Sequence, residues 1–82
     1  MITYCRRRSR NKTMTQQAMQ FGGNNYGKIM DFTKNLAKLD ENKKFVLGTE
    51  EIQEGDYVIK NKDGTFHVED TREFGINFEI IE

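Results

Sequence analysis

The stretch Gly55-Asp56-Tyr57-Val58-Ile59-Lys60-Asn61-Lys62-Asp63-Gly64-Thr65-Phe66-His67-Val68-Glu69 decides the fold. Two runs rich in β-branched and aromatic residues flank the pair Asp63-Gly64, and this pattern is typical of a β-hairpin. Gly64 supplies the left-handed backbone conformation that either a two-residue primed turn or a type I turn with a glycine bulge requires. The sequence therefore predicts two antiparallel strands joined at Asp63-Gly64.

The alternation of side chains along this hairpin predicts which of them face a core. Neighbouring residues in a strand point to opposite faces, so a strand register also assigns the faces. Whichever of the two turns forms, we expect one face of the hairpin to contact a helix and to carry Tyr57, Ile59, Phe66 and Val68. The residues expected mainly on the other face are Lys60, His67 and Glu69.

The residues before the hairpin predict a strand followed by a helix. Ala18-Met19-Gln20-Phe21 has the composition of a short strand, and Gly22-Gly23 ends it because paired glycines favour a turn. Asn24 or Asn25 is expected to cap a helix over about residues 25–39. Its apolar residues recur at spacings of 3, 4 and 3, which places them on one helical face: Ile29, Phe32, Leu36 and Leu39.

Further extended segments are expected on both sides of the hairpin. Residues 44–49, Lys-Phe-Val-Leu-Gly-Thr, predict a second strand, and residues 50–55 form an acidic connection. After the hairpin, Thr71 precedes acidic Glu73 in the arrangement of a helix N-terminus, so we expect a short helix or turn over 71–75. A last extended segment would carry Ile76, Phe78 and Ile80. The predicted fold class is α+β, with one main helix packed on a small, mostly antiparallel sheet that has a C-terminal hairpin.

Length, charge and cysteine content limit the organisation of the chain. Its 82 residues, 35% of them hydrophobic, suffice for one small core. The single cysteine, Cys5, excludes an internal disulfide and any Cys-x-x-Cys motif, and fits a reducing cytoplasm. No apolar run approaches the roughly 20 residues of a membrane span. We therefore expect a cytoplasmic protein.

The basic residues are unevenly distributed. Residues 1–14 carry five basic residues and no acid, whereas residues 15–82 carry eight basic and 13 acidic residues and have a net charge of −5. We interpret residues 1–14 as a flexible basic extension, with a possible short strand over 2–5, and residues 15–82 as a single α+β domain. Met14 followed by Thr15-Gln16-Gln17 resembles a translation start, which would make the preceding residues an upstream extension.

No residue pattern indicates catalysis, a cofactor or a metal. His67, the single histidine, has Glu69 and Lys60 as strand neighbours, and these are ordinary solvent-face residues rather than a nucleophile and base. Gly22-Gly23 lacks the further glycines, or the Gly-Lys-Ser/Thr sequence, of a phosphate-binding loop. The spacing of the acidic residues does not match a calcium-binding loop. We expect a non-enzyme without cofactors.

Two charged surfaces are candidates for binding. An acidic cluster before the hairpin could attract a basic protein surface, and together with the hairpin's polar face it predicts a partner-binding set of Glu50, Glu51, Glu54, Lys60, His67 and Glu69. The basic tract could neutralise phosphates, with Tyr4 stacking on a base, and predicts a nucleic-acid-binding set of Arg6, Arg7, Arg8, Arg10 and Lys12. Exposed sheet edges could also pair with another copy of the chain.

The order of these pieces resembles a family of small phage and prophage proteins. The resemblance covers about residues 17–79, from Ala18-Met19-Gln20-Phe21 through Asn24-Asn25-Tyr26 and Ile29-Met30-Asp31-Phe32 to Phe74 and Phe78. Its most specific piece is Gly55-Asp56-Tyr57-Val58-Ile59-Lys60 with Gly64-Thr65-Phe66, which is similar to that family's Gly-Asp-Tyr-Ile-Ile-Lys strand and Gly-x-Phe return strand. The resemblance implies an origin rather than a mechanism.

These observations lead to two functional hypotheses. The first is a non-enzymatic phage or prophage accessory protein that binds a host or phage protein, for example to inhibit defence or replication. The alternative is a nucleic-acid-binding protein that uses its basic N-terminal tail, with the domain behind it as an anchor.

Overall fold

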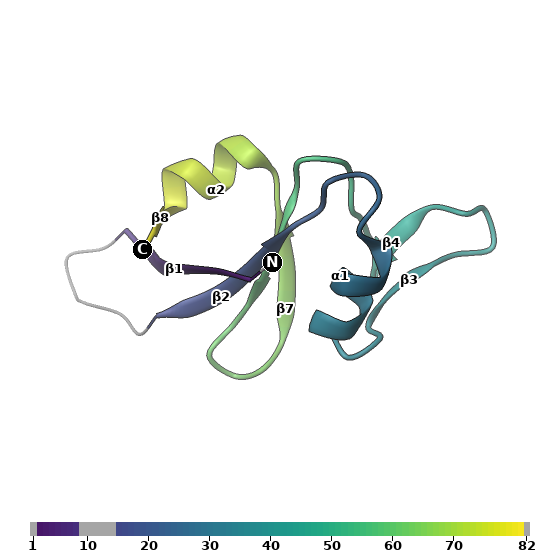
Figure 1. Ribbon diagram of the computed structural model, residues 1–82, viewed down its shortest axis with the longest axis horizontal. Helices are drawn as coiled ribbons and strands as arrows, with labels where there is room; N and C mark the ends of the chain where they lie inside the picture. The colour runs from purple at the N-terminus through teal and green to yellow at the C-terminus, as the bar shows by residue number, and fades with distance from the viewer. Residues whose placement is uncertain (1, 9–14, 82) are drawn as a thin grey trace.

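The chain is an α+β protein, as predicted, and its computed structural model describes residues 2–8 and 15–81 (Figure 1). The elements in chain order are β1 (Thr3–Arg7), β2 (Gln16–Gln20), α1 (Tyr26–Phe32), β3 (Ala37–Leu39), β4 (Phe45–Leu47), β5 (Glu50–Glu51), β6 (Tyr57–Lys60), β7 (Phe66–Glu69), α2 (Thr71–Asn77) and β8 (Phe78–Ile80). The molecule is elongated, 42 × 24 × 22 Å, and the β3–β4 hairpin forms one of its ends (Figure 1).

Two antiparallel sheets organise the described strands. The larger has five strands in the order β7-β6-β2-β1-β8, and the smaller has three in the order β3-β4-β5. The helices α1 and α2 have seven residues each, so neither is the single main helix that was predicted. Within the described ranges, no helix is long and apolar enough to cross a membrane.

The first strand corrects the predicted domain boundary. β1 lies inside the five-stranded sheet, where Tyr4 pairs with Gln17 of β2 and Arg6 pairs with Glu79 of β8. The interpretation of residues 1–14 as a flexible extension is therefore wrong for Thr3–Arg7, which belong to the domain. Alternation explains how so polar a segment forms an interior strand, because Cys5 is fully buried while Tyr4 and Arg6 point the other way. The expected translation start at Met14 lies outside the described residues.

The hairpin forms where it was predicted, but its register differs. Lys60 pairs with Phe66, and Asn61 donates its backbone N–H to Thr65 O, so residues 62–64 form the loop. Gly64 has φ 88°, as a type I turn with a glycine bulge requires. That turn adds one residue to the two-residue alternative, and a shift of one residue exchanges the faces of one strand relative to the other.

The predicted faces of the hairpin are consequently wrong. Tyr57 and Ile59 share a face with His67 and Glu69, whereas Val58 and Lys60 share the opposite face with Phe66 and Val68. Both faces are covered over part of their area, so the hairpin has no single solvent face. Ile59 and Val58, which point in opposite directions, are both fully buried.

Two apolar cores lie on the two faces of the five-stranded sheet. The first core lies between the sheet, α1 and the small sheet, and its buried residues are Met19, Phe21, Ile29, Ala37, Phe45, Ile52 and Val58. The second lies on the α2 side and is built from Cys5, Ala18, Ile59, Phe74 and Phe78. In β2 and β6, neighbouring apolar residues therefore point into opposite cores, as in a strand that is buried on both faces.

The first helix is half its predicted length. It ends at Phe32 because Lys34 and Asn35 adopt left-handed conformations, with φ 55° and 67°. The buried hydroxyl of Thr33 donates to Ile29 O at 2.9 Å and accepts from the backbone N–H of Ala37 at 3.0 Å. These bonds turn the chain into β3.

Two of the apolar residues expected on the helical face are consequently exposed. Leu36 is 57% exposed and Leu39 is 47% exposed, whereas Ile29 is fully buried. The predicted cap is also different in kind, since Asn25 is the N-cap of α1 but makes no side-chain cap bond. Its amide instead closes the preceding turn, accepting from Gly22 N–H and donating to Gln20 O.

The second helix connects the hairpin to the last strand. Asp70 caps α2, accepting from the backbone N–H of Glu73 at 2.7 Å, whereas the hydroxyl of Thr71 donates to Gly55 O. Tyr57, Phe74 and Phe78 stack beneath the helix, with ring centroids 3.8 Å and 5.2 Å apart in the two successive pairs. The predicted helix or turn over 71–75 thus extends to Asn77, and the last strand pairs with β1.

Candidate functional site

The three arginines at the N-terminus are bound within the protein. Arg6 Nε lies 2.6 Å from Glu79 Oε1, and this hydrogen bond, with the arginine's charge, lowers the pKa of Glu79. Arg7 lies over the ring of Phe78, with its guanidinium carbon 4.7 Å from the ring centroid. Arg8 Nε donates to the backbone oxygens of Gly75 and Phe78. These side chains tie β1 to β8 and the end of α2.

The predicted nucleic-acid tail is therefore not one surface in this structure. Arg6 lies on the face of β1 opposite to Arg7, because successive residues of a strand alternate. Arg10 and Lys12, the other two predicted members, lie outside the described residues. Sequence reasoning counted the charges of this segment but could not see that β8, about seventy positions later, supplies their partners.

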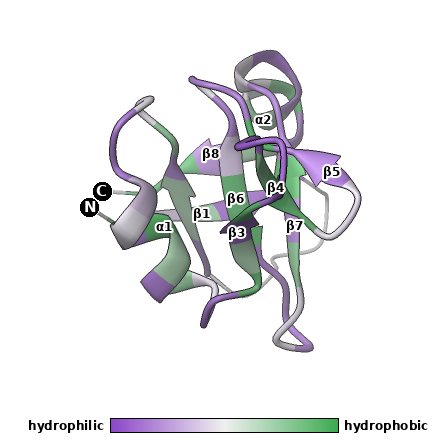
Figure 2. Ribbon diagram, turned by 90° about the vertical axis from the view of Figure 1, so that its right-hand side faces the viewer, coloured by the Kyte–Doolittle hydropathy of each residue, from purple (hydrophilic) through white to green (hydrophobic). Residues whose placement is uncertain are grey.

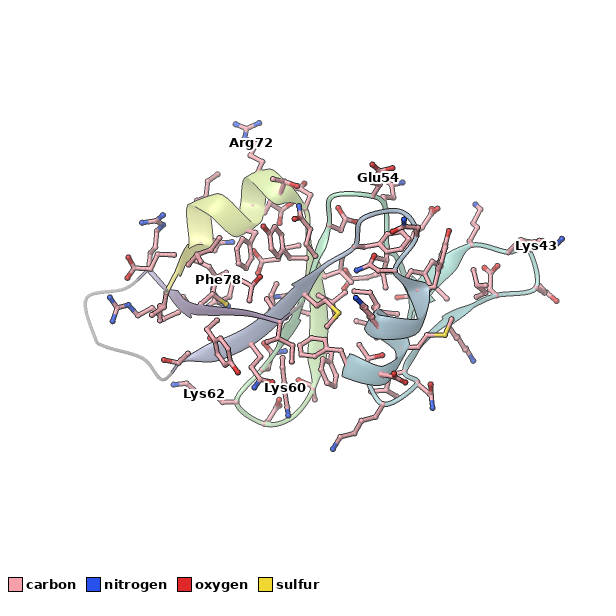
Figure 3. The ribbon with its side chains drawn as sticks, in the orientation of Figure 1. Lys43, Glu54, Lys60, Lys62, Arg72 and Phe78 are labelled. Atoms are coloured by element: carbon pink, nitrogen blue, oxygen red, sulfur yellow. The ribbon has the colours of Figure 1, made fainter. Side chains whose placement is uncertain are left out.

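The acidic members of the predicted partner site lie near the small sheet. Glu50 and Glu51 form β5, an outer strand, and both are exposed. Glu54 is exposed on the following loop and lies over Gly23, where an added Cβ would be 2.9 Å from Glu54 Oε1 (Figure 3). Phe21, Tyr26 and Phe45 join this region to the large sheet, with all three pairs of ring centroids 5.0 Å apart.

The hairpin members of the predicted site do not join those acids. Lys60 is half-buried on the α1 face, whereas His67 and Glu69 lie on the α2 face. Glu69 is only 8% exposed, so it belongs to the interior and not to a binding surface. The six predicted partner-binding residues therefore occupy separate regions, and no single partner patch contains them all.

His67 and Glu69 belong to a network of polar side chains. Glu69 Oε2 lies 2.7 Å from His67 Nε2, and Glu69 Oε1 accepts from Asn77 Nδ2 at 3.0 Å. The other ring nitrogen of His67 lies 2.9 Å from Asn61 Oδ1. Both ring nitrogens of His67 thus face side-chain oxygen atoms.

The network continues into the hairpin turn. Asn61 Nδ2 donates to the Thr65 hydroxyl, which in turn donates to Asp63 Oδ1 at 2.6 Å. The hydrogen bonds from the hydroxyl and the backbone N–H of Thr65 lower the pKa of Asp63. Because each member is held by the next, the network fixes the turn, β7 and the end of α2 relative to one another.

Cys5 lies close enough to Glu69 of this network for the carboxylate's charge to affect the pKa of its thiol. Burial raises the pKa of the Cys5 thiol to about 11, and the negative charge of Glu69 adds to the shift. The thiol is therefore protonated at neutral pH and is fully buried, which is the environment of a structural cysteine rather than a nucleophile. Across residues 2–8 and 15–81, no group of three His, Cys, Asp or Glu residues could hold a metal ion.

An exposed part of the large sheet carries a surface that sequence reasoning missed. Tyr4 is 49% exposed and pairs with Gln17 of β2, and extending the register of β2 and β6 by one residue places Lys60 beside Gln17. These residues line a cavity of about 330 Å³ together with Lys62 from the hairpin loop. We call Tyr4, Gln17, Lys60 and Lys62 the basic platform; Figure 3 shows its two lysines near the hairpin loop. The alternation of Tyr4 and Arg6 with Cys5 was the available signal.

The small sheet has a second exposed surface. Lys38, Val46 and Glu51 lie opposite one another in its three strands and therefore share a face. Leu36, which directly precedes β3, is exposed next to that face, and Ala37 and Phe45 occupy the buried side. We call Leu36, Lys38, Val46 and Glu51 the outer face of the small sheet. Figure 2 shows this end of the molecule, with hydrophilic β5 at the sheet's edge.

No family model, curated protein or solved structure matches this chain.

Proposed function

We propose that the chain is a non-enzymatic accessory protein that binds another protein through the outer face of the small sheet. The observation that carries this proposal is the position of Leu36, which is 57% exposed directly before β3, at the start of the small sheet of an elongated molecule. A large apolar side chain beside a displayed sheet is an anchor of the kind found at protein interfaces. Val46, half-buried beside it, adds apolar area to the same face.

The charges around this face favour a partner with basic as well as apolar residues. Glu51 lies on the outer face itself, and its neighbour Glu50 is exposed on the same edge strand. Glu54 follows on the adjoining loop. Such acids would steer a basic surface toward the sheet, whereas Leu36 would supply the contact that slows dissociation.

We further propose a phage or prophage origin and action in the host cytoplasm. The resemblance of residues 17–79 to small phage proteins supports the origin, and the lone cysteine fits a reducing compartment. A host or phage protein, for example one that serves in defence or replication, is then the expected partner.

The test is affinity capture from host lysate with surface variants as controls. The unaltered chain should recover a stoichiometric protein, and both Leu36→Glu and Glu51→Lys should lose it. Ile76→Glu is the matched control, since Ile76 is 61% exposed on α2, away from the small sheet. Recovery that Leu36→Glu leaves unchanged, or no stoichiometric partner at all, would count against the proposal.

Nucleic-acid binding is the second candidate function, now proposed for the sheet face that carries Tyr4 and Lys60 rather than for the basic tail. Arg6, Arg7 and Arg8 have partners inside the domain, which weakens the case for a freely extended basic tail. The observation that favours this candidate is instead the exposed ring of Tyr4 in the same sheet face as Lys60.

A further inference from the structure

The basic platform combines the chemical groups that recognise a nucleotide chain. Tyr4, Gln17 and Lys60 form one row across β1, β2 and β6, with neighbouring strands about 4.8 Å apart. The row thus presents an aromatic ring, an amide and an ammonium group in sequence. Lys62 adds a second ammonium group from the hairpin loop, at the rim of the same cavity.

The charge of the platform is available to a ligand. Of the residues that the structure describes, two lysines and no acidic residue line the cavity. Among the residues that the structure describes, neither Lys60 nor Lys62 has a carboxylate within salt-bridge distance. Arg6 differs, because its guanidinium is already bound to Glu79 at 2.6 Å beside the platform. The lysines are therefore the groups that would meet phosphate.

The shape of the surface favours a single strand over a duplex. Tyr4 lies on a strand of the sheet and is 49% exposed as a residue, so a base could stack on its ring only when released from a double helix. Neither seven-residue helix stands on the platform to enter a major groove, since α1 packs on the neighbouring part of the face and α2 packs on the other side. The amide group of Gln17 at the cavity offers a donor and an acceptor for a base edge.

We propose that the basic platform binds single-stranded nucleic acid. Tyr4 stacks on a base, Lys60 and Lys62 neutralise the flanking phosphates, and the Gln17 amide limits how the base lies. This site is separate from the outer face of the small sheet, so either proposal can fail without the other.

The test is fluorescence anisotropy of the full chain with a labelled single strand of about 12 nucleotides, within the range of known site sizes. Binding should weaken steeply as salt rises, because each neutralised phosphate releases counterions. Tyr4→Ala should weaken it by roughly tenfold, whereas Tyr4→Phe, which keeps the ring, should retain it. Lys60→Gln and Lys62→Gln should each reduce the salt dependence by about one phosphate contact.

Matched controls separate the platform from general attraction to a polyanion. Lys43→Gln removes a lysine at the far tip of the β3–β4 hairpin and should leave affinity nearly unchanged (Figure 3). A double change of Arg10 and Lys12 to Gln tests the tail, and the matching duplex tests the preference for single strands. Circular dichroism of each variant shows whether it is folded, and Leu36→Glu should bind the oligonucleotide normally.

Several results would overturn the proposal. One is the absence of binding at low salt. Another is binding that survives Tyr4→Ala but is lost with Arg10 and Lys12, which would assign it to the tail. Equal losses from Lys43→Gln and Lys60→Gln would show non-specific attraction. Tighter binding to the duplex, or to vesicles of anionic lipid that compete with the single strand, would identify a different ligand.

Discussion

The two sheets of this small protein use their apolar residues in opposite ways. The five-stranded sheet is covered on both faces over much of its area, so that Cys5, Ile59 and Phe78 are at most 1% exposed. The three-stranded sheet has strands of only two or three residues and buries only part of one face, while Leu36 directly before β3 and Leu39 at its end remain about half exposed or more. Apolar surface that contributes to stability in one sheet is displayed by the other.

This difference separates the frame of the molecule from its surfaces. The large sheet, with β1 in its interior, contains the aromatic stack under α2 and the Asn61–His67–Glu69–Asn77 network. The small sheet is anchored mainly through Phe45 and Ala37. We therefore expect changes in the large sheet to affect stability, and changes on the outer face of the small sheet to affect binding.

The largest expected effect is the loss of β1. A chain that starts at Met14 lacks the strand between β2 and β8, together with Cys5 and the three arginines that hold β8. Both backbone ladders of β1 disappear, so we expect no cooperative unfolding transition in urea. A Met14–Glu82 chain that unfolds cooperatively at the midpoint of the full chain would show that the frame does not depend on β1.

The next effect compares one apolar residue from each sheet. Phe78→Ala removes a side chain that is 1% exposed and stacks on Phe74, so it should lower the free energy of unfolding by about 3–5 kcal/mol. Leu39→Ala, at a residue 47% exposed in β3, should change it by no more than about 0.5 kcal/mol. Urea denaturation measures both, and similar losses would erase the difference between the sheets.

A smaller effect is expected from the polar network. Glu69→Ala removes the buried carboxylate that His67 and Asn77 contact. It should lower the free energy of unfolding by about 2 kcal/mol. Glu69→Gln retains a hydrogen-bonding amide and should cost less. Glu51→Ala on exposed β5 is the matched control and should be nearly neutral. If Glu69→Gln were as destabilising as Glu69→Ala, hydrogen bonding would not be the source of the loss.

The smallest effect concerns the pH dependence of stability. Cys5 has a pKa of about 11 in the folded chain, against 9.0 for a free thiol. Since the folded value is raised, the contribution of the thiol is complete below about pH 9 and is lost as pH rises toward about 11. Relative to Cys5→Ala, the unaltered chain should lose about 1 kcal/mol between about pH 8 and about pH 10. If the free energies of unfolding of the two chains changed with pH in the same way, the Cys5 thiol would not be shielded from solvent in the folded chain.

The sequence predicted the hairpin but not its register. Alternating apolar residues and Asp63-Gly64 were enough to place β6 and β7. The same faces were expected from both turns that Asp63-Gly64 fits, although a two-residue and a three-residue loop differ in register by one residue. Because a one-residue difference exchanges faces, a local ambiguity in the turn reversed the assignment of His67 and Glu69. The buried network could not be foreseen for the same reason.

Two other differences come from contacts that are distant in sequence. The apolar spacing of Leu36 and Leu39 continues the helical period, but Thr33 and the left-handed Lys34 and Asn35 end α1 first. The arginines of β1 resemble a tail until β8 supplies their partners. The basic platform could not be predicted from the sequence for the same reason, because β2 is what brings Tyr4 and Lys60 into one row.

Hydrogen exchange of the β1 amides tests the central claim, that β1 is an interior strand that holds the frame and positions Tyr4. An interior strand is bonded on both sides, so consecutive amides are protected, whereas an edge strand protects alternate ones. We predict that the amides of Cys5 and Arg6, which lie where β1 pairs with Gln16 of β2 and Glu79 of β8, exchange as slowly as those of β2. Exchange of these two amides at the rate of an unstructured peptide, while β2 and β6 stay protected, would contradict the account.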